Sequence, residues 1–204
     1  MLSSTELRWF YPGKLPEAVS AWFNAKYSGN DLELPEKRAD IYLAIATDCD
    51  YMGIKLRQGR LEIKWRKAEL GIVSIVPKVE GKLETWDKWT CEDSTATNFQ
   101  PQSVIDKSHW VTVSKVRQQR KYQVLKQKSV QDVPISANVD QGCNLELTQL
   151  SIKGNDWWSI ALEAFGASTD NLHLVANQVF QHYDGFSLQA KDSFAYPRWL
   201  TTAI

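Results

Sequence analysis

The sequence predicts a single α+β domain in which antiparallel strands dominate and a few helices flank the sheet. Many segments alternate charged with apolar residues, as strands with one buried face do. Two other segments place apolar residues at helical spacing. The 204 residues suffice for one hydrophobic core. No repeat, low-complexity tract or linker divides them, so residues 1–204 are expected to form one domain.

Strands are assigned to the segments with the clearest alternation. The first covers residues 5–11 and ends at the turn signal Pro12-Gly13. Gln58-Gly59 is a short turn of the hairpin type, so the strands on its two sides are expected to pair. The remaining strands are expected at residues 39–46, 51–58, 60–67, 71–76, 82–92, 109–126, 143–152 and 156–165.

Two segments are typical of amphipathic helices. Residues 15–27 place their apolar side chains on one helical face, as a helix packed on a sheet does. Asp170 is a suitable N-cap for a second helix at residues 171–183, which also carries an apolar stripe. Residues 127–141 show neither periodicity and are expected to form a loop.

Charge and composition argue against several classes of function. The chain has 24 basic and 24 acidic side chains, so its formal net charge is zero. It therefore lacks the overall positive charge that attracts proteins to nucleic acids or anionic lipids, and neither partner is expected. No apolar segment approaches the roughly 20 residues of a membrane span. The N-terminus also lacks the features of a secretory signal, so a cytoplasmic protein is expected.

The most informative pattern is the alternation of charge within the strands. In the segment Arg60-Leu61-Glu62-Ile63-Lys64-Trp65-Arg66, charged residues occupy every even position and apolar residues every odd one. Because side chains of a strand point alternately to its two faces, the four charges share one side of the sheet. Residues 54–57 and 115–117 repeat this alternation with lysine and arginine.

Basic residues are concentrated in two segments. Residues 51–67 carry a net charge of +5 and residues 107–128 a net charge of +7, so the rest of the chain carries −12. One interpretation is that these are solvated faces of antiparallel strands, where lysine and arginine deter edge pairing. The other is that the basic faces converge inside a closed sheet whose apolar faces are covered by helices. Such an interior would hold counter-anions and act as an anion site.

Two segments, Asp40-Ile41-Tyr42-Leu43 and residues 53–64, both alternate apolar with charged or polar residues. They are similar to the second to fourth strands of the CYTH or triphosphate tunnel metalloenzyme superfamily. Residues 5–10 stand where the family carries its amino-terminal Glu-x-Glu-x-Lys strand. Further similar segments occur in the family's order at residues 115–117, 144–147, 158–163 and 195–200.

This resemblance implies an antiparallel eight-stranded β tunnel that binds the triphosphate of a nucleotide, thiamine triphosphate or inorganic tripolyphosphate. It implies that basic side chains hold the phosphate oxygens, and that carboxylates hold Mg²⁺ or Mn²⁺ for hydrolysis. By position, the basic candidates for substrate binding are Arg8, Lys55, Arg57, Lys64, Arg66, Lys115 and Arg117. The candidate metal-side carboxylates are Glu6, Glu62, Glu146 and Glu163.

The sequence also departs from the family pattern. Arg8 stands at the second glutamate of the amino-terminal motif and Phe10 at its lysine. A guanidinium cannot ligate a metal, so Arg8 would pair with Glu6 or with a bound anion. Two hypotheses therefore remain: a triphosphatase that depends on a divalent metal, and a catalytically inactive module on the same scaffold that binds an anion or another protein.

Overall fold

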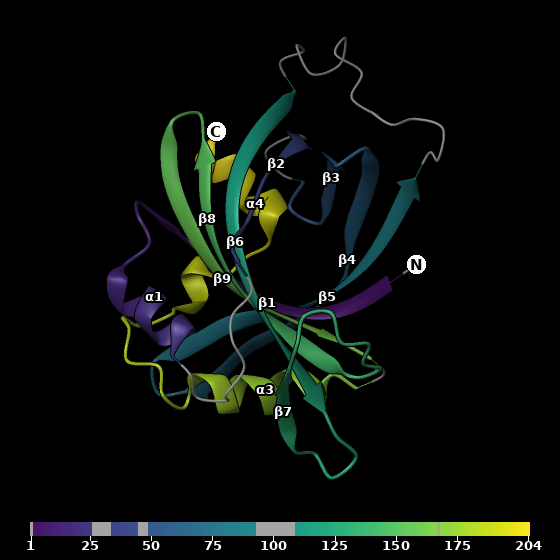
Figure 1. Ribbon diagram of the computed structural model, residues 1–204. Coiled ribbons are helices and arrows are strands. Elements are labelled where there is room, and N and C mark those ends of the chain that lie inside the picture. The colour runs from purple at the N-terminus through teal and green to yellow at the C-terminus, as the bar shows by residue number, and fades with distance from the viewer. Residues whose placement is uncertain (1, 26–33, 45–48, 93–108, 167) are drawn as a thin grey trace.

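Antiparallel strands and helices form an α+β fold in the computed structural model, which describes residues 2–25, 34–44, 49–92, 109–166 and 168–204 (Figure 1). The strands are β1 (Leu2–Pro12), β2 (Glu36–Leu43), β3 (Met52–Arg57), β4 (Arg60–Val76), β5 (Val79–Glu92), β6 (Trp110–Val124), β7 (Val130–Val133), β8 (Gly142–Ile152) and β9 (Asn155–Phe165). The helices are α1 (Glu17–Asn24), α3 (Asp170–Phe180) and α4 (Tyr196–Ala203), with a 3₁₀ turn at Ala190–Asp192. None of these described helices is long and apolar enough to span a membrane.

The sheet closes into a barrel of eight strands. Neighbouring strands pair in the order β2-β3-β4-β5-β1-β9-β8-β6, and β2 also pairs with β6, which joins the two ends. This last pairing runs from Glu36 opposite Arg117 to Leu43 opposite Trp110. The ninth strand, β7, adds to the far end of β6. Closure satisfies the backbone groups that two sheet edges would expose. The predicted antiparallel eight-stranded fold is therefore confirmed.

Two tight turns set the register of neighbouring strands. Gln58 and Gly59, between β3 and β4, have φ angles of 47° and 77°. Lys153 and Gly154, between β8 and β9, have φ angles of 48° and 81°. Positive φ at both central residues is the requirement of the hairpin turn whose twist matches that of paired strands. The hairpin predicted at Gln58-Gly59 is confirmed.

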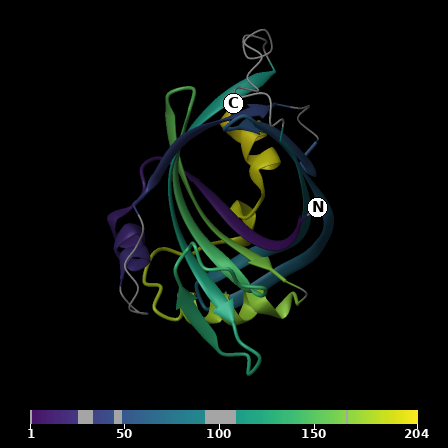
Figure 2. The ribbon, with the colours of Figure 1, turned by 45° about the vertical axis from the view of Figure 1, so that its right-hand side comes forward.

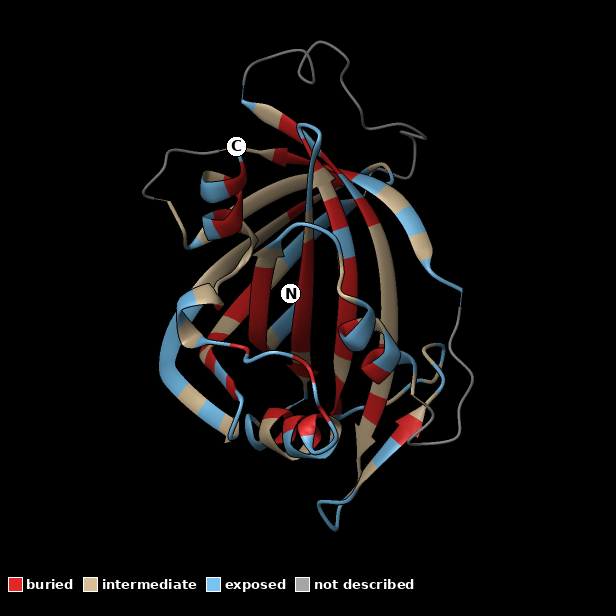
Figure 3. Ribbon diagram, turned by 90° about the vertical axis from the view of Figure 1, so that its left-hand side faces the viewer, coloured by how far each residue is buried: buried red, intermediate tan, exposed pale blue. Residues whose placement is uncertain are grey.

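The larger core lies on the outer side of the barrel, under α1 and α3. Apolar side chains of β1, β8 and β9 form its sheet side, and Trp9 and Trp158 are almost completely buried there. Trp22 of α1 stacks on Phe180 of α3 with ring centroids 5.3 Å apart, and Trp9 meets Phe180 edge-on at 6.0 Å. Figure 3 shows the buried bands along these strands and the buried face of α3.

A second core fills one end of the barrel interior. Figure 2 shows α4 inside the barrel opening. Trp199 of α4 is fully buried and stacks on Phe10 of β1, with ring centroids 5.1 Å apart. Phe194 stacks on the same phenylalanine at 5.6 Å. Inward-facing apolar side chains of β2, β6 and β8 complete this cluster, so α4 closes one end of the barrel with an apolar plug.

The structure corrects three details of the sequence prediction. Residues 60–76 form the single strand β4, whose bulges absorb the irregular alternation that suggested two strands. The predicted loop at 127–141 contains β7, which pairs with β6. The helix α3 begins at Asp170, so Asp170 is not the N-cap of this helix. The backbone N–H of Asp170 donates to the Ser168 hydroxyl. The predicted ends at residues 27 and 46 lie outside the described residues.

A further correction concerns the outer face of β4. Leu61, Ile63 and Trp65 alternate with the inward charges, as the sequence predicts. They are only half-buried, however, and they belong to neither core. The helices cover the β1, β8 and β9 side of the barrel, because those strands carry the larger continuous apolar surface.

We predict that the apolar plug contributes strongly to stability. Replacing Trp199 by alanine is expected to lower the free energy of unfolding by about 3–5 kcal/mol, because it leaves a cavity beneath Phe10. The matched control is Trp89→Ala, whose side chain is 44% exposed and which should cost about 1 kcal/mol or less. Chemical denaturation followed by circular dichroism measures both. Equal losses in the two variants would contradict this role of α4.

Candidate functional site

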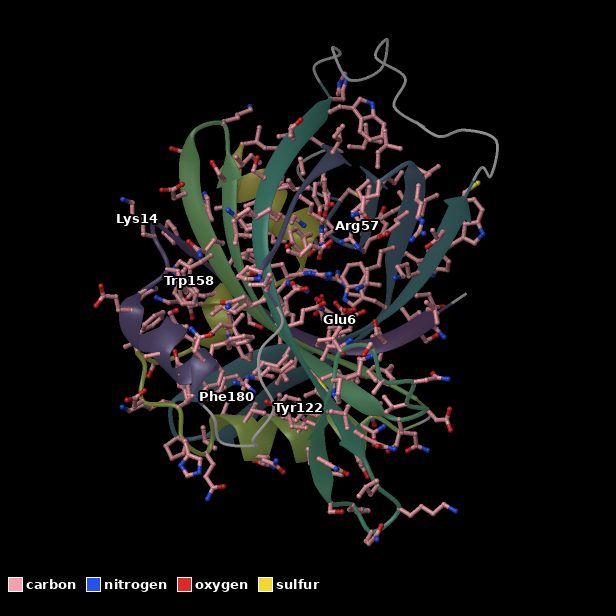
Figure 4. The ribbon with its side chains drawn as sticks, viewed as in Figure 1. Glu6, Lys14, Arg57, Tyr122, Trp158 and Phe180 are labelled. Carbon is pink, nitrogen blue, oxygen red and sulfur yellow. The ribbon has the colours of Figure 1, made fainter. Side chains whose placement is uncertain are left out.

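The charged side chains inside the barrel surround a cavity of about 270 Å³. Two residues labelled in Figure 4, Glu6 and Arg57, lie inside the barrel, whereas Lys14 projects from its outside. Among the described residues, the basic side chains that line the cavity are Arg8, Arg38, Lys55, Arg57, Lys64, Lys88, Lys115 and Arg117. The lining carboxylates are Glu6, Glu62, Glu146 and Glu163. Basic groups thus outnumber carboxylates eight to four along this lining.

The structure brings ten of the eleven sequence-predicted site residues to this cavity. Six of the seven basic candidates and all four glutamates line it. Arg66 does not line the cavity, although it lies two residues after Lys64 on β4 and the two side chains should point to the same face. A register shift follows Arg66, and its guanidinium binds Asp50 at 2.9 Å and Glu84 at 3.0 Å. Arg66 therefore lies beyond one end of the cavity in its own cluster of ion pairs.

One wall of the cavity is built around the fully buried carboxylate of Asp40 on β2. Lys115 of β6 binds it at 2.9 Å, and Arg38 and Arg57 each bind it at 3.2 Å. Lys55 of β3 lies 4.0 Å away. Burial opposes the charge of Asp40, but the surrounding lysines and arginines outweigh it and hold its pKa far below the usual range. We call these four basic residues and Asp40 the Asp40 cluster.

The two lysines of the Asp40 cluster have unusually acidic ammonium groups. The Lys115 side chain is 1% exposed; its amine lies 2.6 Å from the Tyr42 hydroxyl and 4.0 Å from the centre of the Tyr196 ring. Burial lowers the pKa of Lys115 to about 7, against the attraction of Asp40. Burial, together with repulsion from Arg57 and Lys115, also lowers the pKa of Lys55 to about 7. Both amines therefore change charge near neutral pH.

The opposite wall combines three glutamates with basic partners. Arg8 of β1 donates to Glu146 of β8 at 2.8 Å, and Arg117 of β6 binds the same carboxylate at 3.3 Å. Burial would raise the pKa of Glu146, but the two guanidinium groups lower it well below its usual range. Lys64 of β4 pairs with Glu6 and lies 3.8 Å from Glu163. The charge of Lys64 is the first cause of the lowered pKa of Glu163.

This wall does not have the arrangement of a divalent-metal site. Three of the four predicted metal-side glutamates lie on this wall and are paired with its own basic groups. The fourth, Glu62 of β4, pairs with Lys55 at 3.0 Å and Arg57 at 3.5 Å. In the described part of the chain, no three acidic, cysteine or histidine side chains gather as a metal ion requires. Because these carboxylates are held in ion pairs, the residues present do not offer Mg²⁺ or Mn²⁺ a set of free oxygen ligands.

The cavity opens at the end opposite α4 into a wider hollow of about 410 Å³. The two share the side chains of Arg38, Arg57, Glu62, Lys88 and Arg117. Within the described residues, Lys88 of β5 has no carboxylate within 4.0 Å, unlike the other basic side chains of the cavity. The mouth therefore adds uncompensated positive charge at the open end.

Sequence reasoning missed several residues of this site. Arg38, Asp40 and Tyr42 face inward from β2, because they alternate with Ala39 and Ile41. That alternation is visible in the sequence, but a strand predicted to begin at residue 39 excluded Arg38 and left Asp40 at its end. Lys88 lies two residues after Trp86 on β5, so both side chains point into the barrel. Tyr196 reaches the cavity from α4, and no local pattern indicates that this helix enters the barrel.

No model of a known protein family matches the chain, and no curated protein matches it. The resemblance to the CYTH superfamily therefore stays a prediction. The closed antiparallel barrel and the charges inside it stand independently of that resemblance.

The acidic ammonium groups predict an unusual pH dependence of stability. The pKa values of Lys55 and Lys115 are about 7 in the folded protein and 10.5 in an unperturbed lysine. Between these values the unfolded chain binds more protons than the folded one, so stability should rise with pH. The free energy of unfolding is expected to rise by up to about 1.4 kcal/mol per lysine for each pH unit. Denaturation at several values between about pH 7 and 9 measures it. Constant or falling stability would contradict the assignment.

Proposed function

We propose that this protein binds a small polyanion, such as tripolyphosphate or the triphosphate of an organic molecule, inside its barrel. The observation that carries the proposal is the excess of basic over acidic side chains around one enclosed cavity. Positive charges in a confined, water-poor space repel one another, and a bound anion relieves that repulsion. Arginine and lysine are also the side chains that bind phosphate oxygens best, arginine through its planar fork and lysine as a compact charge.

The shape of the cavity supports a ligand with one long anionic end. The apolar plug closes the cavity on the side of Phe10 and Trp199, so a ligand enters from the basic mouth. The inner volume of about 270 Å³ lies just below the range of about 300–1,000 Å³ that is usual for drug-sized ligands. A phosphate chain therefore suits the inner cavity, and a larger organic group would remain in the wider mouth.

Binding without hydrolysis is the function that these side chains favour. Hydrolysis of a phosphoanhydride by a metal ion needs free carboxylates to hold that ion. Glu6, Glu62 and Glu146 instead form ion pairs with Lys64, Lys55 and Arg8. These pairs keep the carboxylates ionised and occupied, so we propose a binding module whose own cations hold the ligand.

Thermal denaturation with inorganic tripolyphosphate tests the binding. A ligand at 100 times its dissociation constant stabilises the folded state by about 2.7 kcal/mol, so the melting temperature should rise. The double variant Arg57→Ala plus Lys64→Ala removes one cation from each wall and should lose most of this shift. The matched control is Lys67→Ala, on the same strand with a side chain 54% exposed, which should retain the shift. No shift in the wild type would contradict the proposal.

The same ligand tests whether a metal takes part. Removing divalent ions with EDTA should leave the shift in melting temperature unchanged, because Arg8 and its neighbours supply the positive charge. Incubation with Mg²⁺ or Mn²⁺ should release no phosphate from tripolyphosphate or nucleoside triphosphates above the level of the double variant. Turnover that depends on the metal and is lost in the double variant would instead establish the hydrolase.

A further inference from the structure

Asp40 has more cationic partners than one carboxylate can neutralise. Arg38, Arg57 and Lys115 all lie within 3.2 Å of its oxygens, and its side chain has no exposed surface. A guanidinium keeps its proton at any pH that a folded protein experiences. Each arginine also binds a second carboxylate, Glu36 or Glu62. The four cations of the Asp40 cluster therefore share three carboxylates, and because the arginines stay charged, the excess falls on a lysine, of which Lys115 is the more deeply buried.

The surroundings of Lys115 favour its neutral form in the absence of a ligand. Its side chain is 1% exposed, so the ammonium ion gains almost no hydration from solvent. The Tyr42 hydroxyl lies 2.6 Å from the amine and can donate a hydrogen bond to its lone pair once the proton is lost. The Tyr196 ring, whose centre lies 4.0 Å from the amine, and the Asp40 carboxylate favour the charged form, but burial opposes them and lowers the pKa of the amine.

We propose that a polyanion bound in this cavity is accompanied by a proton, which the Lys115 amine takes up as the anion arrives. This inference rests on the proposed anion binding and adds its control by pH. The anion supplies the negative charge that Asp40 cannot provide to three partners, so the charged amine becomes the stable form. The site then binds its ligand more tightly in mildly acidic than in alkaline solution.

Of the other groups around the amine, all but one keep a fixed charge near neutral pH. The charged and titratable side chains that face Lys115 are Arg38, Asp40 and Tyr42 of β2, Lys55 and Arg57 of β3, Glu146 of β8 and Tyr196 of α4. Burial raises the pKa of both tyrosines, so they stay protonated, and the pKa values of Asp40 and Glu146 lie far below neutrality. Lys55 is the only other member that titrates near neutral pH.

Titration calorimetry with inorganic tripolyphosphate tests the proposal. At about pH 8, measurements in two buffers of different ionisation enthalpy give the number of protons taken up on binding. Two variants fix the charge at position 115: the side chain is always charged in Lys115→Arg and never charged in Lys115→Met. Because tripolyphosphate also titrates, each variant is compared with the wild type at the same pH, which cancels the protons of the ligand. The control variant Lys67→Arg carries its change at an exposed residue that does not line the cavity.

The wild type and the control should take up close to one proton more than either Lys115 variant. From about pH 7 to 9, the affinity of the wild type should fall relative to Lys115→Arg by up to about tenfold per pH unit. Equal proton uptake in the wild type and both variants would overturn the role of Lys115 and leave the anion binding intact. Failure of tripolyphosphate to bind at any pH would overturn the proposed function as well.

A measurement on the wild type covers the case in which a variant does not fold. The ¹³C resonance of the lysine Cε atom reports the charge of each amine. Two such resonances, those of Lys55 and Lys115, should titrate near pH 7 in the free protein, and the Lys115 resonance should move above about pH 9 with saturating tripolyphosphate. If no lysine resonance titrates below about pH 9 in the free protein, the proposal is wrong.

Discussion

The pairing of β2 with β6 is the interaction on which the rest of the structure depends. It closes the sheet, so the inward residues of all eight barrel strands face one enclosed space. It also sets Arg38 opposite Lys115, which brings Asp40 next to that amine. A charge on an open sheet could be solvated, but in a closed barrel it must find a partner among the other inward residues. The ion pairs of the cavity are the consequence of closure.

Closure also divides the barrel interior into two chemically different parts. At one end Phe10, Trp199 and the apolar residues of β2, β6 and β8 pack as a dry core. At the other end the charged residues surround the cavity and its mouth. The boundary falls within single strands: Arg8 and Phe10 are inward neighbours on β1, and one pairs with Glu146 while the other stacks on Trp199. The plug therefore closes one end of the tunnel.

The sequence predicts the strands and inward faces well, because alternation is a local property. Lys55, Arg57, Glu62 and Lys64 were assigned to one face from their spacing alone, and all four line the cavity. Arg66 has the same spacing, but a bulge in β4 and the neighbouring Glu84 place it elsewhere. The contact between Asp40 and Lys115 depends on barrel closure across 75 positions of the chain, and local patterns carry no information about it.

In the proposed anion site, the internal carboxylates would favour ligands with several charges. A single anion that binds one cation merely replaces an internal partner such as Glu62 or Glu146, and the displaced carboxylate remains in the cavity because its strand holds it. The exchange therefore gains little. A chain of phosphates contacts cations on both walls at once and neutralises the excess that Asp40 and the glutamates leave. These internal ion pairs compensate most of the charge in the barrel, so the proposed site would select ligands by the number of their charges.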